Sequence, residues 1–418
     1  MWEKRYSEAR VNLNKKVLLS YNSDIDHIKF LGDTIWLRNY RGKPKRIRSV
    51  RDFFKGLLFS IENGKALELL IEDTRTYEFL KNLSYDEKRL GGQAGIMANL
   101  FSLFSDFVVC YPFRLSRELA MLFRENVLFP RNSKLVRAMK AFKKTESERH
   151  FVFEFQEGFK AFDFEAPREN RFITSFVNPN LEFSKGFDEM LLSTKFEKAM
   201  ISGFHLILEK YENGTYRDFL KKVKEHIKIL KENETEIHLE FASINSEKME
   251  KAVILEILPM VSSLGLNEVE LSSIMKFFKR DSGEDVISVL ENLEFLKNRF
   301  KLSRIHLHDF GYYLCLEERL NQDSLLSSSL VAASKAYFGE IRQREDLFRA
   351  FRFPISHLGL EKLRILGVYL ESREFQDTGI FDRGDYFIDF VPTKIVSNPK
   401  STVGLGDTIS GIGFLGAE

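Results

Sequence analysis

The chain has 418 residues, of which 44% are hydrophobic and 30% are charged. This length and composition are typical of a soluble globular protein with one large core, or with a core and a smaller appended domain. Lysine and arginine total 63 and aspartate and glutamate total 61, which gives a formal net charge of +2. A charge so close to neutral excludes a strongly basic chain, and we expect neither nucleic acid nor a membrane as the main partner.

The two cysteines, Cys110 and Cys315, are too few and too far apart for a disulfide framework or a cysteine-based zinc site. Both lie in apolar runs, which predicts buried free thiols. The N-terminal residues are charged and lack the apolar core of a signal peptide. No apolar run approaches the roughly 20 residues needed to cross a bilayer, so we expect a cytoplasmic protein. Glutamine is scarce beside lysine and glutamate, a composition typical of thermophilic proteins.

Short apolar runs alternate with longer amphipathic ones along most of the chain. In the first quarter this pattern predicts a strand at 16–21, helices at 50–63 and 93–104, and a strand at 106–111. From the middle onward it predicts, in order, a strand at 198–207, a helix at 216–231, a strand at 236–242, a helix at 246–264, a strand at 266–271, a helix at 284–300, two strands within 304–316, a helix at 325–337 and a strand at 386–396. Such alternation is typical of βαβ units, which form a mostly parallel sheet with helices on both faces.

Two segments depart from this alternation. Residues 27–46 hold aromatic and β-branched residues around a Gly-Asp turn, and residues 148–176 alternate apolar and polar side chains around Glu157-Gly158, as a hairpin does. We predict that the two segments pair into a small β-sheet lid over the carboxyl-end edge of the main sheet, where substrates of open α/β sheets bind. The predicted division is a lid of 24–46 and 148–176 and a large nucleotide-binding α/β domain of 1–23, 47–147 and 177–418.

The strongest single pattern is Gly404-Leu405-Gly406-Asp407, which precedes a run of small and apolar residues. It predicts a Gly-rich turn that enters a helix, because glycine permits unusual backbone angles. The free N–H groups of such a turn lie at the positive end of the helix dipole and suit a phosphoryl group. Asp407 could then take a proton from an attacking hydroxyl. An ordinary N-cap after a glycine turn is the alternative, and the GxxxxGK[ST] pattern of a Walker loop is absent.

This run resembles the GxGD motif of the ribokinase-like kinases, and the residues before it resemble the ADP-dependent glucokinase and phosphofructokinase family. Motifs similar to that family's occur along nearly the whole chain: YNSDID at 21–26, GGQAGIMAN at 91–99, FEAPRENRF at 164–172, HLE at 238–240, NEVE at 267–270, IHLH at 305–308, GYY at 311–313, PTKIV at 392–396 and PKST at 399–402. The resemblance implies a ribokinase-like three-layer sandwich with a small lid, and an ADP-dependent sugar kinase of the glucokinase type.

The resemblance also implies roles for single residues around the nucleotide. Asp407 matches the catalytic base, and the N–H groups of Gly404, Leu405, Gly406 and Asp407 match an anion hole. Arg171 matches an arginine that reaches from the lid to the transferred phosphate, where a guanidinium meets two oxygens at once. Positions matching Mg²⁺ ligands are Glu240, Glu270 and Asp407, and positions matching nucleotide contacts are Glu169, His238, Asn267, His308 and Val396.

Mg²⁺ keeps several of its waters, so the contacts at these carboxylates can be indirect. Taken alone, His238 and Glu240 would be alternate residues of one buried strand, and a hydrogen-bonded core pair explains them equally well. Asn267 and Glu270 would be unremarkable without the resemblance.

For the sugar, the resemblance implies contacts at Asp24, Asp26, Glu68, Gly92, Gln93 and His150. Carboxylates and amides suit hydroxyl recognition, because each can hold two hydroxyl groups. Without the resemblance, Glu68 would be an exposed helix residue and His150 an edge residue of a lid strand.

Two positions depart from the family pattern, where Asp24 replaces an asparagine and Asp309 replaces a threonine. Asp24 adds a second carboxylate near Asp26, and like charges close together raise one pKa unless a positive group pairs with them. Either the sugar carries a cationic group, such as the amine of glucosamine, or Asp24 accepts a hydrogen bond from a sugar hydroxyl. Asp309 leaves the nucleotide preference open.

The acidic set of Asp24, Asp26 and Glu68 would repel a sugar phosphate, which favours a neutral or amino hexose over fructose 6-phosphate. We therefore predict transfer of the β-phosphoryl group of ADP to the 6-hydroxyl of glucose or glucosamine, with AMP as the second product and Mg²⁺ as cofactor. ADP as donor rests on the resemblance alone. An ADP-dependent phosphofructokinase, another sugar or nucleoside kinase of the same fold, and a non-catalytic binding relative remain alternatives. The expected partners are the sugar and ADP, and the expected state is a monomer or small homo-oligomer.

Overall fold

The computed structural model describes residues 1–32, 36–244, 246–283 and 285–417. A large sheet of eleven strands forms the centre of the molecule, in the order β19-β20-β18-β17-β16-β15-β12-β1-β5-β6-β7. These strands are β1 (Val17–Tyr21), β5 (Val108–Pro112), β6 (Val127–Arg131), β7 (Lys134–Arg137), β12 (Lys198–Ile201), β15 (Glu236–Glu240), β16 (Ser263–Leu266), β17 (Arg304–Asp309), β18 (Tyr312–Glu317), β19 (Ile380–Asp382) and β20 (Phe387–Pro392). From β17 across to β6 neighbouring strands are parallel, and the strands at both edges are antiparallel.

Helices cover both faces of the large sheet. In β1, Leu18 belongs to one buried hydrophobic cluster, whereas its neighbours Val17 and Leu19 belong to another. Successive side chains of a strand point to opposite faces, so the two clusters lie on opposite sides of the sheet. The helices of this part are α1 (Trp2–Glu8), α4 (Gln93–Phe101), α5 (Arg117–Ala120), α6 (Ala138–Ala141), α7 (Lys185–Ser193), α8 (Tyr216–Glu232), α9 (Glu247–Ala252), α10 (Glu268–Phe277), α11 (Val286–Phe300), α12 (Gln322–Phe338), α13 (His357–Tyr369), α14 (Arg373–Thr378) and α15 (Leu405–Gly416). The predicted three-layer α/β architecture is confirmed.

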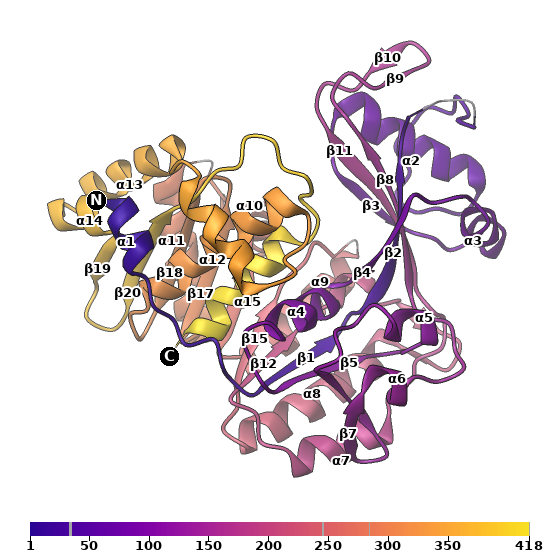
Figure 1. The fold of residues 1–418 in the computed structure, drawn as a ribbon, viewed down its shortest axis with the longest axis horizontal. Helices are drawn as coiled ribbons and strands as arrows, with labels where there is room; N and C mark the ends of the chain where they lie inside the picture. Colours follow the sequence, from indigo (N-terminus) through magenta and orange to yellow (C-terminus); the bar gives the residue numbers. More distant parts are fainter. Residues whose placement is uncertain (33–35, 245, 284, 418) are drawn as a thin grey trace.

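A second, five-stranded sheet stands apart from the large one, at the upper right of Figure 1. Its order is β3 (Leu67–Leu70), β11 (Asn170–Phe176), β8 (Arg149–Phe155), β2 (Asp24–Phe30) and β4 (Glu87–Gly91). Helices α2 (Val50–Asn63) and α3 (Thr74–Lys81) pack on it and belong to its own hydrophobic cluster, in which Phe53 contacts Phe153 and Phe172. Two short hairpins complete the chain: β9 (Lys160–Ala161) with β10 (Phe164–Glu165), and β13 (Lys210–Tyr211) with β14 (Gly214–Thr215).

The two segments predicted to form a lid do pair, since β2 and β8 are parallel neighbours, and β8 returns antiparallel to β11. The sheet takes in more of the chain than the predicted boundaries allowed. Residues 50–91 were assigned by sequence to the large domain. They supply strands β3 and β4 to the second sheet, and helices α2 and α3 to the hydrophobic cluster packed on it. Part of the predicted turn near Gly32 lies outside the described residues.

Four predicted elements end in other places. The strand expected at 198–207 stops at Ile201, because Gly203 turns the chain with φ 86° into a short 3-10 helix at 204–206. The helix expected at 246–264 ends at Met260, and β16 begins three residues later at Ser263. The strand expected at 266–271 is instead the start of α10, since Asn267 and Glu270 form a reciprocal capping box. The strand expected at 386–396 ends at Pro392.

The buried free thiols are confirmed for both cysteines. Among the described residues, no helix combines the length and the apolar character that crossing a membrane requires.

Candidate active site

A cleft of about 560 Å³ lies between the second sheet and the carboxyl ends of strands in the large sheet. Glu240 ends β15, Asn267 follows β16 and His308 is near the end of β17, and all three line it. The residues from the sequence analysis that line this cleft are Asp26, Glu68, Gly92, Gln93, His150, Arg171, Glu240, Asn267, Glu270, His308, Gly404, Leu405, Gly406 and Asp407. Segments far apart in the chain therefore meet at the edge where ligands of open α/β sheets bind.

The Gly-rich turn enters α15 as the sequence predicts. Gly404 is the N-cap residue with φ 65°, a left-handed conformation that glycine adopts at little cost. A side chain at Gly406 would lie 2.8 Å from Nε2 of His308, so a larger residue would displace that histidine. The first N–H groups of α15 have no partner in a preceding helical turn and carry the positive end of the helix dipole. This helix start faces the cleft and can accept an anion.

Asp407, in the first turn of α15, is held by a glutamine from the start of α4. Gln93 Nε2 donates to Asp407 Oδ1 at 3.0 Å, and Gln93 Oε1 accepts from the backbone N–H of Gly203 at 3.0 Å. Burial raises the pKa of Asp407, while the hydrogen bond from Gln93 and the charge of Lys335 partly offset the increase. The carboxyl group is thus fixed, faces the cleft and has an elevated pKa, which suits a general base.

Arg171 connects the second sheet to the Gly-rich turn. It lies on β11, and its Nη1 donates to Thr402 Oγ1 at 2.8 Å. Its Nε has no hydrogen-bond partner among the described residues. The guanidinium therefore reaches across the cleft to the turn and keeps donors free for a phosphate.

The nucleotide side of the cleft holds buried carboxyl groups with raised pKa values. Burial raises the pKa of Glu240 well above its ordinary value, and the charge of Asp407 raises it further. Burial likewise raises the pKa of Glu270 to about 8. Glu240 Oε2 also lies 3.1 Å from Nε2 of His238. Carboxyl groups that raise one another's pKa favour a bound cation.

The donor set fits Mg²⁺, because carboxylate oxygens are the protein ligands that it prefers. In the described part of the chain, however, Glu240, Glu270 and Asp407 do not approach one another within 4.8 Å as a set of three. The geometry therefore fits an ion that keeps part of its water shell and contacts some of these residues indirectly.

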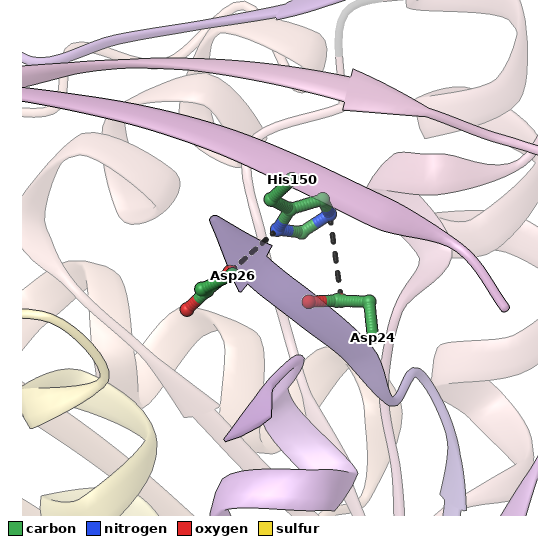
Figure 2. Close-up of side chains that lie close together, drawn as sticks. All are labelled: Asp24, Asp26 and His150. Atoms are coloured by element: carbon green, nitrogen blue, oxygen red, sulfur yellow. Dashed lines mark ion pairs between the residues drawn. The ribbon is translucent and has the colours of Figure 1, made fainter. Parts of the chain in front are cut away.

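The sugar side holds a histidine between two aspartates (Figure 2). His150 of β8 places Nε2 3.4 Å from Asp24 Oδ2 and Nδ1 3.4 Å from Asp26 Oδ1, both on β2. Although burial opposes it, the charges of Asp24, Glu68 and Asp26 raise the pKa of His150 to about 10. Asp24 is fully buried behind His150, and neither of its oxygens has a hydrogen-bond partner among the described residues.

This triad answers the question that Asp24 raised. Burial raises the pKa of Asp24 well above its ordinary value, and the charge of His150 beside it partly offsets this increase. Asp24 therefore has a cationic partner within the protein and needs none from the sugar. The ligand atoms of the three residues also lie within 4.8 Å of one another, a separation that a single metal ion can bridge. An imidazolium and a metal ion exclude each other at this position.

Glu68 completes the sugar side from β3, a strand and not the exposed helix that the bare sequence suggests. Its Oε1 accepts from Ser175 Oγ at 2.6 Å. Burial raises the pKa of Glu68, but His205, His150 and the Ser175 hydrogen bond outweigh burial and leave it below the ordinary value. Glu68 is therefore an ionised acceptor for hydroxyl groups.

Three predicted nucleotide contacts lie away from the cleft. Glu169 is exposed in the loop between β10 and β11. His238 is fully buried, where it binds Ser263 and orients Glu240. Val396 packs against the main hydrophobic cluster. Asn267 lines the cleft, but its Oδ1 is used to cap α10.

Sequence reasoning missed three residues at the site. Thr402 Oγ1 accepts from Arg171, and His205 lines the cleft with its Nδ1 unpartnered among the described residues. Lys335 of α12 contacts the Gly-rich turn. Thr402 belongs to the PKST motif at 399–402 and could have been found from it. No sequence pattern marks His205 or Lys335, because long-range packing brings them to the site.

The fold and the cleft define a class of protein. An open α/β sheet with a Gly-rich helix start, a fixed carboxylate and a cross-cleft arginine is the arrangement of a phosphoryl-transferring enzyme. A family model described as the ADP-specific Phosphofructokinase/Glucokinase conserved region matches residues 15–416. The chain belongs to that family, so it is a phosphotransferase with the ribokinase-like fold, as the sequence resemblance implied.

Similar proteins include kinases of two kinds. An ADP-dependent glucose/glucosamine kinase of Pyrococcus abyssi is 37% identical over 99% of this chain and 98% of its own length. An ADP-specific phosphofructokinase of Methanosarcina acetivorans is 32% identical over 99% of this chain and 96% of its own length. A solved ADP-dependent kinase in complex with fructose 6-phosphate and ADPβS has a TM-score of 0.88 and 33% identity, covering 99% of this chain and 97% of that one.

Proposed function

We propose that the chain transfers the β-phosphoryl group of ADP to the 6-hydroxyl of glucose or glucosamine, giving the sugar 6-phosphate and AMP. The observation that carries this proposal is the cleft itself, in which Asp407 and Arg171 face an acidic sugar side formed by Asp26 and Glu68. The two relatives with glucose/glucosamine kinase activity in their names, at 37% and 35% identity, support the same choice of sugar.

The residues of the cleft fit an in-line transfer. The sugar lies between the two sheets, and closure of the smaller sheet excludes water, which would otherwise accept the phosphoryl group. Asp407 takes the proton of the 6-hydroxyl while that oxygen attacks the β-phosphorus of ADP. The bond from this phosphorus to the oxygen that bridges it to the α-phosphate breaks, and AMP leaves. Arg171 and the first N–H groups of α15 hold the negative charge that spreads over the transferred group.

Glu240 and Glu270 are the residues that would hold Mg²⁺ together with ADP. The ion, when bound, neutralises charge on the phosphate oxygens. Their raised pKa values agree with such a role, because a divalent cation is the partner that these buried carboxyl groups lack.

The electrostatics of the sugar side support a neutral or amino hexose. His150 is the cation in contact with Asp24 and Asp26, and its charge is already used by that pair. Glu68 adds a further negative charge. A sugar phosphate would bring about two more negative charges toward these carboxylates. The repulsion at short range would weaken its binding. Asp24 contacts His150 and would affect the sugar only through that histidine. Both a hydroxyl group and an amine on the sugar are therefore compatible with this side of the cleft.

A phosphofructokinase is the second candidate, and the structural comparison favours it. The solved kinase with a TM-score of 0.88 was studied with fructose 6-phosphate, and a 32% identical relative is named as a phosphofructokinase. The free donors of Arg171 and the imidazole of His205 are the cleft groups that a second phosphate could use.

A coupled assay of AMP release separates these candidates. Purified protein with Mg²⁺ is incubated with ADP or ATP and with glucose, glucosamine or fructose 6-phosphate, and Asp407→Asn serves as the blank. We expect AMP with glucose and glucosamine and a kcat/KM at least about 10-fold lower with fructose 6-phosphate. A preference for fructose 6-phosphate would establish the second candidate. ADP binding without turnover on any sugar would instead identify a non-catalytic relative.

A further inference from the structure

A buried lysine that does not line the cleft supports the Gly-rich turn. Lys335 lies on α12 and is 9% exposed. Its Nζ donates to the carbonyl oxygen of Gly404 at 3.0 Å and to Thr408 Oγ1 at 3.1 Å. The same carbonyl accepts from the Thr408 hydroxyl at 2.7 Å and from the Thr408 N–H at 3.1 Å. One carbonyl oxygen at the start of α15 is therefore held by three donors.

The direction of this carbonyl decides the direction of the next N–H group. A trans peptide places its C=O and its N–H on opposite sides of a rigid plane. Because the Gly404 carbonyl points along α15 toward Thr408 and Lys335, the N–H of Leu405 points the other way. It donates to the carbonyl oxygen of Thr402 at 3.4 Å, and the side chain of the same threonine accepts from Arg171. Gly404 itself has φ 65°, a conformation from which this peptide could otherwise rotate easily.

Lys335 also places a positive charge near Asp407. The charge of Asp407 raises the pKa of Lys335, and the charge of Lys335 lowers the pKa of Asp407. Burying an ammonium group costs free energy, and burial lowers the pKa of Lys335 to about 8. A neutral donor such as a threonine could hold the carbonyl at lower cost, and Thr408 already does so. The lysine is therefore better explained by the anionic chemistry beside it than by stability alone.

We propose that Lys335 is a positioning residue for phosphoryl transfer, which orients the first peptide of the Gly404–Asp407 turn through the Gly404 carbonyl and the Thr408 hydroxyl. The expected loss of kcat rests on the proposed function, whereas the expected effect on the conformation of the turn does not. Lys335 touches neither substrate: it acts through Gly404 and Thr408. Loss of a residue that orients a reacting group usually costs about 10- to 100-fold in activity.

The test compares Lys335→Met with Lys297→Met. Lys297 of α11 is also a buried lysine, 6% exposed, and it also donates to backbone carbonyls. Its acceptors are Leu302 and Ser303, however, and not residues of the Gly404–Asp407 turn. We expect Lys335→Met to lower kcat about 10- to 100-fold while the KM values for ADP and sugar change less than about threefold. Lys297→Met should lower stability and leave kcat unchanged. An equal kcat for both variants, after correction for the folded fraction, would overturn the proposal.

Two further readouts keep the inference testable if the variant is poorly folded or the wild type turns over no sugar. Small alkylamines should restore part of the activity of Lys335→Ala, since an amine can refill the space that the shortened side chain leaves. Hydrogen–deuterium exchange of the peptide spanning 402–410 should be faster in Lys335→Met than in the wild type or in Lys297→Met. Unchanged exchange at 402–410 would refute the positioning role whatever the sugar assay shows, whereas an inactive wild type would count against the proposed function alone.

Discussion

The two sides of the cleft are both acidic, but they balance their charge in different ways. On the sugar side, His150 lies between Asp24 and Asp26, and its pKa is raised to about 10 by these carboxylates and by Glu68. On the nucleotide side, burial raises the pKa of Glu240 and of Glu270. The histidines next to this second group carry lowered pKa values from burial and stay neutral.

The difference indicates what each side needs from its ligand. The sugar side carries its own cation, which agrees with the proposed uncharged or amino hexose. The nucleotide side has carboxyl groups whose charge is unfavourable until a cation arrives, and in the proposed reaction the magnesium complex of ADP would bring one. In the proposed reaction Asp407 serves both sides, since it would act as base toward the sugar and add negative charge near the cation.

The largest effect is expected at Asp407. Asp407→Asn keeps the size of the side chain but removes the general base, so kcat should fall about 10³- to 10⁴-fold. ADP binding measured by calorimetry should survive, because the helix start is unchanged. Since the pKa of Asp407 is raised by burial, the wild-type kcat/KM should fall as pH drops through that raised value, and any residual activity of Asp407→Asn should lack this acid limb. Near-normal turnover by the variant would remove Asp407 from the mechanism.

Arg171 joins the two sides physically, and its loss should have the second largest effect. Arg171→Met removes the charge that meets the transferred group and the contact with Thr402, so kcat should fall about 10²-fold. Arg168 is a matched control, since it lies just before β11 and its Nε donates to the carbonyl of Gly64 at the end of α2. Arg168→Met should keep kcat within about twofold. A similar loss in both variants would mean that this segment is disturbed and that Arg171 makes no special contact.

Much of this architecture follows from sequence pattern. The alternation of strands and helices predicted the parallel sheet, and the GLGD run predicted the turn before α15. Local pattern failed where two rules competed. The apolar alternation after Gly265 favoured a strand, but the Asn267–Glu270 capping box ended β16 and started α10.

Assignment to a sheet and long-range contacts were harder to predict. The sequence of the short β3 does not indicate which sheet it joins. Its pairing with β11 depends on packing against the phenylalanines of α2 and β11, which are distant in sequence. His205 reaches the cleft from the 3-10 turn after β12, and Lys335 reaches the Gly-rich turn from α12. Both are distant in sequence from the residues that they approach. The pairing of His150 with two aspartates was likewise hidden, because the parallel register of β2 and β8 sets it.

Glu270 tests the claim that the nucleotide side lacks a cation. Its folded-state pKa of about 8 lies above the ordinary value of 4.5, so the metal-free protein keeps a proton that the unfolded chain has released. Stability should therefore fall as pH rises from 4.5 toward 8. In Glu270→Gln this loss should be smaller, and the melting temperature at pH 8 should rise by a few degrees relative to the wild type. Differential scanning calorimetry with EDTA measures the effect.

The same variant should need about 10-fold more Mg²⁺ for half-maximal activity. Glu268→Gln is the control, because Glu268 lies in the same first turn of α10 but is exposed. An unchanged Mg²⁺ requirement in Glu270→Gln would place the ion elsewhere and would make the raised pKa a matter of burial only.

The smallest effect is expected at Asp24, where the charge is balanced within the protein. Asp24→Asn removes one of the two aspartates beside His150, so the pKa of that imidazole should fall from about 10 by more than one unit. The sign follows from the raised value: the pair stabilises the fold fully below the ordinary histidine pKa, and the contribution is lost as pH rises toward 10. A histidine-selective NMR titration measures the shift, with Asp86→Asn, an exposed change at the far end of β2 and β4, as the control.

The kinetic consequence of Asp24→Asn separates the two roles that its carboxylate could have. If His150 is its counter-ion, the ratio of kcat/KM for glucosamine to that for glucose should change less than about threefold, because no sugar group meets the buried oxygens. If the amine of glucosamine is the counter-ion, the ratio should fall about 10-fold or more, as expected for the loss of a charge-assisted hydrogen bond. The second outcome, together with an unchanged pKa of His150, would reverse the assignment and make the sugar side as dependent on a cation from its ligand as the nucleotide side is.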